Sequence, residues 1–223
     1  MRSVKKQALF TIALFLLFLV FTVLVKTVDV RVLGETATDV GFGALNAATL
    51  CPYHESFYEI SQYLGYFALL LCGVFALCGL YQWIRKGSIK KVDYRILLLG
   101  GFYLLVLALY FGFDKLALNY RPVIVDAAEG LEASYPSSHT MLALCVFGTA
   151  MLFCRVAFPN KRALRAASIV ALGALMMLTV ATRYLSGVHW LTDILASILL
   201  SAALVSLYST CVSYVGARRT RRN

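Results

Sequence analysis

Apolar segments long enough to cross a membrane recur along almost the whole chain, and they constrain its fold more than any other feature. A helix needs about 20 apolar residues to cross the roughly 30 Å of bilayer hydrocarbon. Because lipid offers the backbone no hydrogen-bond partners, such segments are expected to be helices. The segments are Ala8–Val25, Tyr63–Trp83, Ile96–Phe113, Met141–Phe153 (which extends back to Ser138), Ala166–Ala181 and Trp190–Val215.

The composition agrees with this interpretation. Hydrophobic residues make up 61% of the chain, against about 45–50% in soluble domains. Only short polar gaps separate the apolar segments, apart from the longer stretch Lys26–Gln62. In that stretch, Val40–Leu50 could form either a short helix along the membrane surface or a plain loop. The sequence therefore predicts one all-α membrane domain over residues 1–223, an integral membrane bundle of six transmembrane helices.

The distribution of Lys and Arg predicts how the helices are oriented. With six spans, four basic clusters fall on one side, which the positive-inside rule assigns to the cytoplasm. Both termini are then cytoplasmic. Each basic residue beside anionic lipid gains about 1 kcal/mol, so the net charge of +10 requires no nucleic acid partner. The clusters hold 16 of the 21 Lys and Arg residues: Arg2, Lys5, Lys6; Arg85, Lys86, Lys90, Lys91, Arg95; Arg155, Lys161, Arg162, Arg165; Arg218, Arg219, Arg221, Arg222.

Three groups of polar residues are expected on the opposite, outer side. They include two of the three His residues, three cations and one acidic residue that would lie inside hydrocarbon, where an unpaired charge costs a few kcal/mol or more. Three cations around two imidazoles describe a phosphate pocket. The groups are Lys115 with Arg121; Pro136, Ser137, Ser138 and His139; and Arg183 with His189 and Asp193.

The spacing within these groups indicates what each could do. On a helix, Asp193 would lie one turn from His189 on nearly the same face, where its carboxylate could accept the ring N–H and leave the other nitrogen free to attack. Ser137 and Ser138 would open a helix, whose free N–H groups favour an anion. Taken singly, Ser137 could be an ordinary cap and Arg183 an ordinary cation at a helix C-terminus.

Together these residues resemble the signature of the type 2 phosphatidic acid phosphatase superfamily, the membrane relatives of the vanadium haloperoxidases. That signature reads Lys, six residues, Arg-Pro; then Pro-Ser-Gly-His; then Ser-Arg, five residues, His, three residues, Asp. The third part matches from Thr182-Arg183 through His189 to Asp193, and the second matches with Ser138 in place of Gly. The resemblance covers roughly residues 96–215, the expected phosphatase core.

The first part of the signature departs from the family pattern. Five residues, not six, separate Lys115 from Arg121, and Asp114 stands at the position of the family's Lys. On a continuous helix a separation of six leaves two residues about 120° apart. A role for Lys115 therefore requires the helix to end or bulge nearby.

The resemblance implies a mechanism. His189, oriented by Asp193, would attack phosphorus to form a phosphohistidine, and His139 would give a proton to the departing oxygen. Arg121, Arg183, Lys115, Ser137 and the backbone near Ser138 would hold the phosphate oxygens. Water would then hydrolyse the phosphohistidine. Neither a metal nor another cofactor is expected, because fixed cations would do the electrostatic work.

The expected function is that of a metal-independent lipid phosphatase in the cell membrane with its site on the outer face. Phosphatidic acid, phosphatidylglycerol phosphate and isoprenyl diphosphates all fit as substrates. Two alternatives use the same residues: a phosphotransferase that passes the phosphate to another lipid, and a non-catalytic carrier of anionic lipid.

Overall fold

Six long helices carry the predicted apolar segments in the computed structural model, which describes residues 2–128 and 130–221. All six are long and apolar enough to cross a membrane. Each predicted segment lies within one of them, except that Trp190 is the N-cap of the last helix. The helices are α1 (Arg2–Thr27), α3 (Glu55–Lys86), α4 (Tyr94–Leu116), α5 (Ser138–Ala157), α6 (Arg162–Leu185) and α7 (Leu191–Thr220).

The helices extend beyond the apolar segments, by up to eight residues at the start of α3. Helical hydrogen bonds continue through polar residues until a cap or a breaker ends them, so hydropathy alone underestimates their length. Gly87, with a φ of 65°, ends α3 and donates its N–H to the Trp83 carbonyl. Asp93 caps α4 by accepting a hydrogen bond from the backbone N–H of Arg95.

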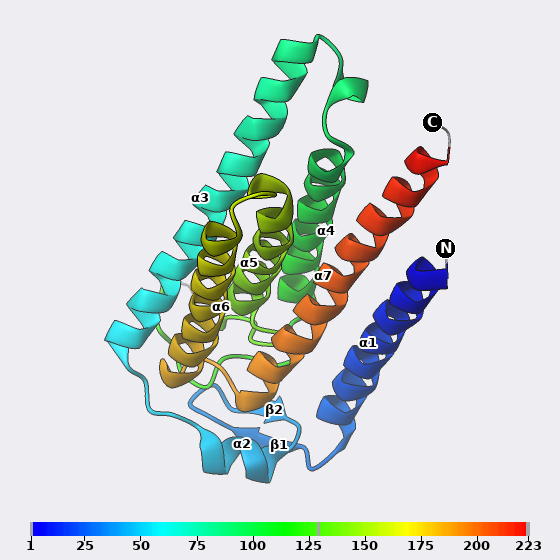
Figure 1. The fold of residues 1–223 in the computed structure, drawn as a ribbon. Coiled ribbons are helices and arrows are strands. Elements are labelled where there is room, and N and C mark those ends of the chain that lie inside the picture. The colour runs from blue at the N-terminus through cyan, green and yellow to red at the C-terminus, as the bar shows by residue number, and fades with distance from the viewer. Residues whose placement is uncertain (1, 129, 222–223) are drawn as a thin grey trace.

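The centre of the bundle is α5, which packs against α3, α4, α6 and α7 (Figure 1). Small residues allow this close packing. A Cβ at Gly148 of α5 would lie only 3.0 Å from the Val205 side chain of α7. α1 packs mainly against α7. There Thr11 lies 2.7 Å from the Ser206 hydroxyl and 3.1 Å from that of Thr210.

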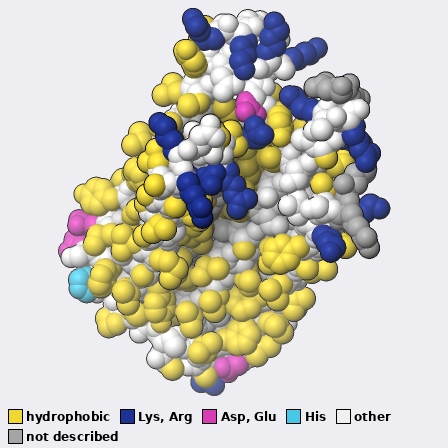
Figure 2. All heavy atoms as spheres, viewed as in Figure 1, with side chains coloured by type: hydrophobic (Ala, Val, Ile, Leu, Met, Phe, Trp, Pro, Cys, Tyr) yellow, Lys and Arg dark blue, Asp and Glu magenta, His cyan; other side chains and the backbone are white. Residues whose placement is uncertain are grey.

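Both termini lie at the same end of the bundle (Figure 1). Lys and Arg side chains gather towards this end in Figure 2, above a broad belt of hydrophobic side chains. The basic clusters occupy the loops α3–α4 and α5–α6 and the ends of α1 and α7, as the predicted topology requires. Of the predicted basic residues, Arg222 lies outside the described residues.

A small layer covers the opposite end of the bundle. It consists of the antiparallel pair β1 (Arg31–Leu33) and β2 (Thr38–Val40), followed by the seven-residue helix α2 (Gly43–Thr49). The helical alternative for Val40–Leu50 is therefore confirmed in part. The two strands were not predicted, because three residues are too few for a period-two pattern to stand out.

This layer is hydrogen-bonded to the loops that connect the helices. Asn46 donates to the Thr192 hydroxyl and accepts from the Thr192 backbone N–H at the start of α7. Thr38 accepts from the Tyr120 N–H, and Thr36 donates to the Arg121 carbonyl. The layer thus fixes the positions of both segments that flank the predicted site.

Candidate active site

The predicted residues Arg183, His189 and Asp193 lie at the junction between α6 and α7. α6 ends at Leu185, and Gly187 adopts a left-handed φ of 71° that favours glycine. A Cβ there would lie 2.5 Å from the Cys51 carbonyl oxygen. The helical path is therefore broken at Ser186-Gly187, and both Arg183 before the break and His189 after it are buried.

A serine bridges His189 and Asp193. The Ser134 hydroxyl lies 2.9 Å from His189 Nδ1 and donates to Asp193 Oδ2 at 2.5 Å. The carboxylate itself is 3.7 Å from Nδ1, beyond hydrogen-bond distance. His189 and Asp193 lie close together as expected, but they do not share a helix face, because His189 precedes Trp190, the N-cap of α7. They are joined mainly through a residue that the sequence analysis did not identify.

The Asp193 carboxylate is fully buried and receives three hydrogen bonds. Besides Ser134, the donors are the Asn119 amide at 3.2 Å and the Trp190 backbone N–H at 3.0 Å. The Trp190 N–H belongs to the N-cap residue of α7, so its hydrogen bond to Asp193 closes the first turn of that helix.

Two arginines bring buried positive charge to the site. Arg183 is 0% exposed; its Nη1 donates to Ser61 Oγ at 3.2 Å, and its guanidinium lies over the Tyr58 ring at 5.4 Å. Arg121 donates from Nη1 to Glu132 Oε2 at 2.5 Å. Neither Ser61 and Tyr58 on α3 nor Glu132 was identified from the sequence, since none lies in a recognisable motif.

Several buried nitrogens of these residues have no hydrogen-bond partner among the described residues. Buried N–H groups are almost always paired, because an unpaired one costs about 1–3 kcal/mol. The N–H groups of the two arginines, Arg121 Nε, Arg183 Nε and Arg183 Nη2, therefore mark a site for an anion. His139 Nδ1 and His189 Nε2 are the other two nitrogens.

The start of α5 forms another part of the site. Ser137 is the N-cap, and its backbone N–H donates to the Asp193 carbonyl at 3.3 Å. Its hydroxyl lies 3.0 Å from Thr140 Oγ1 instead of capping the helix. Ser138 and His139 follow in the first turn, both half-buried.

The surroundings of His189 keep its imidazole neutral. Burial lowers the pKa of His189 well below 6.5, and the nearby charges of Arg183, Arg121 and His139 lower that pKa further. A neutral imidazole whose Nδ1 is engaged and whose Nε2 is unpartnered has the form that a nucleophile needs.

Lys115 is not part of this cluster. It lies exposed in the last turn of α4, which continues to Leu116 before Ala117 turns left-handed. Within the described residues, no hydrogen bond or salt bridge joins Lys115 to the buried residues. α4 ends one residue after Lys115, as a role for Lys115 would require, yet the Lys115 side chain is exposed whereas Arg121 is buried.

A cavity of about 320 Å³ reaches the site from between α3, α4 and α5. Most of its walls are apolar, with Leu69, Leu107 and Leu142 among them, and His139 also lines it. Tyr110 lies beside His139, with 6.4 Å between ring centroids. The cavity could therefore hold a hydrocarbon chain whose polar end reaches His139.

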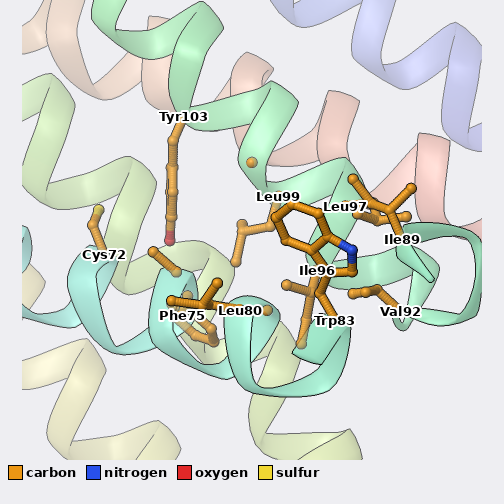
Figure 3. Close-up of a pocket in the computed structure, with 13 residues that line it drawn as sticks. Cys72, Phe75, Leu80, Trp83, Ile89, Val92, Ile96, Leu97, Leu99 and Tyr103 are labelled. Carbon is orange, nitrogen blue, oxygen red and sulfur yellow. The ribbon is translucent and has the colours of Figure 1, made fainter. Parts of the chain in front are cut away.

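A second apolar cavity, of about 300 Å³, lies between α3 and α4 towards the end that carries the termini (Figure 3). Trp83, Leu99 and Tyr103 are among its walls, and none of the described residues that line it is charged. It offers nothing to bind a phosphate. The part of the chain that the structure describes contains no group of three or more His, Cys, Asp or Glu side chains that could hold a metal ion.

Comparison with known proteins agrees with the motifs. Residues 114–217 match the family model of the PAP2 superfamily. The fold is similar to the crystal structure of a transmembrane PAP2-type phosphatidylglycerolphosphate phosphatase from Bacillus subtilis, with a TM-score of 0.62 and 19% sequence identity, over 92% of this chain and 96% of that one. No curated protein matches the chain significantly.

Proposed function

We propose that this membrane protein, whose residues 114–217 match the PAP2 superfamily, hydrolyses a phosphomonoester or diphosphate of a lipid. The observation that carries the proposal is a set of buried nitrogens that have no hydrogen-bond partner among the described residues, contributed by Arg121, Arg183, His139 and His189. An apolar cavity adjoins that cluster at His139. A phosphate with a hydrocarbon tail complements both features.

In the proposed reaction, His189 Nε2 attacks phosphorus while the bond from phosphorus to the leaving oxygen breaks. His139 gives that oxygen a proton. Arg121 and Arg183 hold the equatorial oxygens and stabilise the charge that spreads over them in the transition state. Water then attacks the phosphohistidine, and the P–N bond breaks to release phosphate and His189. The fixed cations take the place that a metal ion has in other phosphatases.

We further propose that the site faces the outside of the cell membrane. It lies at the end of the bundle opposite to the termini and the basic clusters, and the positive-inside rule puts those in the cytoplasm. Phosphatidic acid, phosphatidylglycerol phosphate and isoprenyl diphosphates all combine an accessible phosphate with a long apolar chain.

A substrate panel tests the proposal. The purified protein in detergent is offered these three lipid classes, and released phosphate is measured. Activity is expected on at least one of them, and His189→Ala is expected to abolish it. His54→Ala is the matched control, because His54 is the exposed histidine among the three.

Two results would contradict the proposal. Phosphate release by none of the substrates, or a His189→Ala variant as active as the parent, would leave the site as a carrier of anionic lipid. Transfer of labelled phosphate to a second lipid, with none set free, would identify a phosphotransferase instead.

A further inference from the structure

Ser134 belongs to none of the motifs that define the predicted site, yet its hydroxyl touches two residues assigned to the chemistry. The Oγ atom lies between His189 Nδ1 at 2.9 Å and Asp193 Oδ2 at 2.5 Å. Ser134 is 1% exposed, so water does not compete freely for these contacts. We propose that Ser134 is a positioning residue that couples Asp193 to His189 and fixes the imidazole tautomer.

The direction of the two hydrogen bonds follows from what each group can donate. The Ser134 hydroxyl donates to Asp193 Oδ2, and this bond uses its single proton. The Ser134 oxygen can then only accept from His189, which requires the proton of the imidazole to sit on Nδ1. Nε2 is left with its lone pair, and it is the nitrogen that has no partner in the site.

The backbone around Ser134 is held in place on both sides. The Ser134 N–H donates to the Asn119 carbonyl at 3.0 Å, and the Asn119 side chain donates to the other oxygen of Asp193 at 3.2 Å. The next residue, Tyr135, is buried, and its hydroxyl lies 2.7 Å from Thr22 Oγ1 of α1. Ser134 is therefore a fixed part of the site and not a mobile loop residue.

Without Ser134, nothing would set the tautomer in this way. The direct separation of 3.7 Å between His189 Nδ1 and Asp193 Oδ2 is too long for a strong hydrogen bond. The imidazole could then carry its proton on either nitrogen, and with the proton on Nε2 it could not attack. The loss would affect the chemical step, whereas substrate binding to the two arginines would continue.

The first experiment measures kcat and KM for phosphate release, and it rests on the proposed function. Ser134→Ala is expected to lower kcat by about 10- to 100-fold, since it removes a hydrogen bond to a charged group, and to change KM by less than about threefold. Thr22→Val is the matched control, because it removes a hydroxyl that contacts the same segment beyond the site, and it is expected to keep kcat within about threefold of the parent.

A double-mutant comparison separates coupling from simple packing. If Ser134 acts through Asp193, then Ser134→Ala is expected to cost little further activity in an Asp193→Ala background. An equal loss in both backgrounds would show that the two residues act independently and would overturn the proposal.

The second experiment does not depend on activity. The chain has only three histidines, so the imidazole ¹⁵N signals of His189 can be assigned by their absence in His189→Ala. In the parent, Nδ1 is expected to be protonated and Nε2 unprotonated; Ser134→Ala is expected to shift both signals towards a mixture of tautomers. Unchanged signals would overturn the role of Ser134, whereas a parent that releases no phosphate would overturn only the proposed function.

Discussion

Replacing Arg183 by Lys tests whether the site binds phosphate through a fixed guanidinium and not merely through positive charge. Arg183 is completely buried, and Nη1 is occupied by Ser61. Nε and Nη2 have no hydrogen-bond partner in the part of the chain that the structure describes. They lie on one edge of the planar group and can bind two phosphate oxygens together. Lys keeps the charge but offers a single ammonium in place of this pair.

The expected loss follows from these two nitrogens. A hydrogen bond to a charged group contributes about 1.5–3 kcal/mol, so two of them contribute about 3–6 kcal/mol to the transition state. Each 1.4 kcal/mol corresponds to about a tenfold change in rate. Because the charge of Lys recovers part of the loss, Arg183→Lys is expected to lower kcat/KM by about 10²–10³-fold.

The assay is phosphate release from the best lipid substrate in detergent micelles, together with inhibition by vanadate, a mimic of pentacoordinate phosphorus. Vanadate is expected to bind Arg183→Lys more weakly by a similar factor. Arg31→Lys is the matched control, since its side chain is 53% exposed and it pairs with Asp29 at the surface. If Arg183→Lys folds with the Tm of the parent and retains kcat/KM within about threefold, bidentate binding by Arg183 is refuted.

Three further predictions follow from geometry described above. Gly187→Ala is expected to lower the Tm more than Gly87→Ala does: both glycines have a left-handed φ, which costs other residues about 1–2 kcal/mol, but a Cβ meets the Cys51 carbonyl oxygen only at Gly187. Equal shifts in the two variants would contradict this. Because the pKa of His189 lies well below 6.5, the folded protein protonates this imidazole less readily than the unfolded chain does. The free energy of unfolding is therefore expected to fall as the pH drops below about 6.5, and to fall less steeply in His189→Gln. The His189 ¹⁵N signals should show no protonation down to about pH 6. Glu132→Gln is expected to tighten vanadate inhibition by about 3- to 10-fold, because Glu132 neutralises part of the charge of Arg121, whereas Asp39→Asn, at an exposed acid, should leave inhibition unchanged.

The transmembrane helices could be predicted because each one corresponds to a single continuous apolar segment of the sequence. A run of apolar residues near 20 long has few alternatives in lipid, and each such run became one helix. The layer of β1, β2 and α2 left a weaker trace. Its strands are three residues long, and contacts with distant residues such as Thr192 and Tyr120 stabilise it.

The candidate site could be predicted only where its residues lie close together in the sequence. The four-residue spacing of His189 and Asp193 predicted that they lie close together, and they do, although His189 precedes the N-cap of α7. Ser134 reaches the same pair across 55 residues of sequence, and no local pattern records that contact. The placement of Lys115 depended on where α4 ends, and the sequence does not mark the left-handed turn at Ala117 with a glycine.

The contact between Arg183 and α3 means that the site depends on a helix outside the segment that matches the family model. Ser61 and Tyr58 lie more than fifty residues before the segment that matches the family model, yet they hold the guanidinium that is expected to grip the phosphate. The N-terminal spans are therefore more than an anchor for a self-sufficient enzyme. A chain that began at α4 would keep every residue of the family signature, but it would lack the two α3 side chains that contact Arg183.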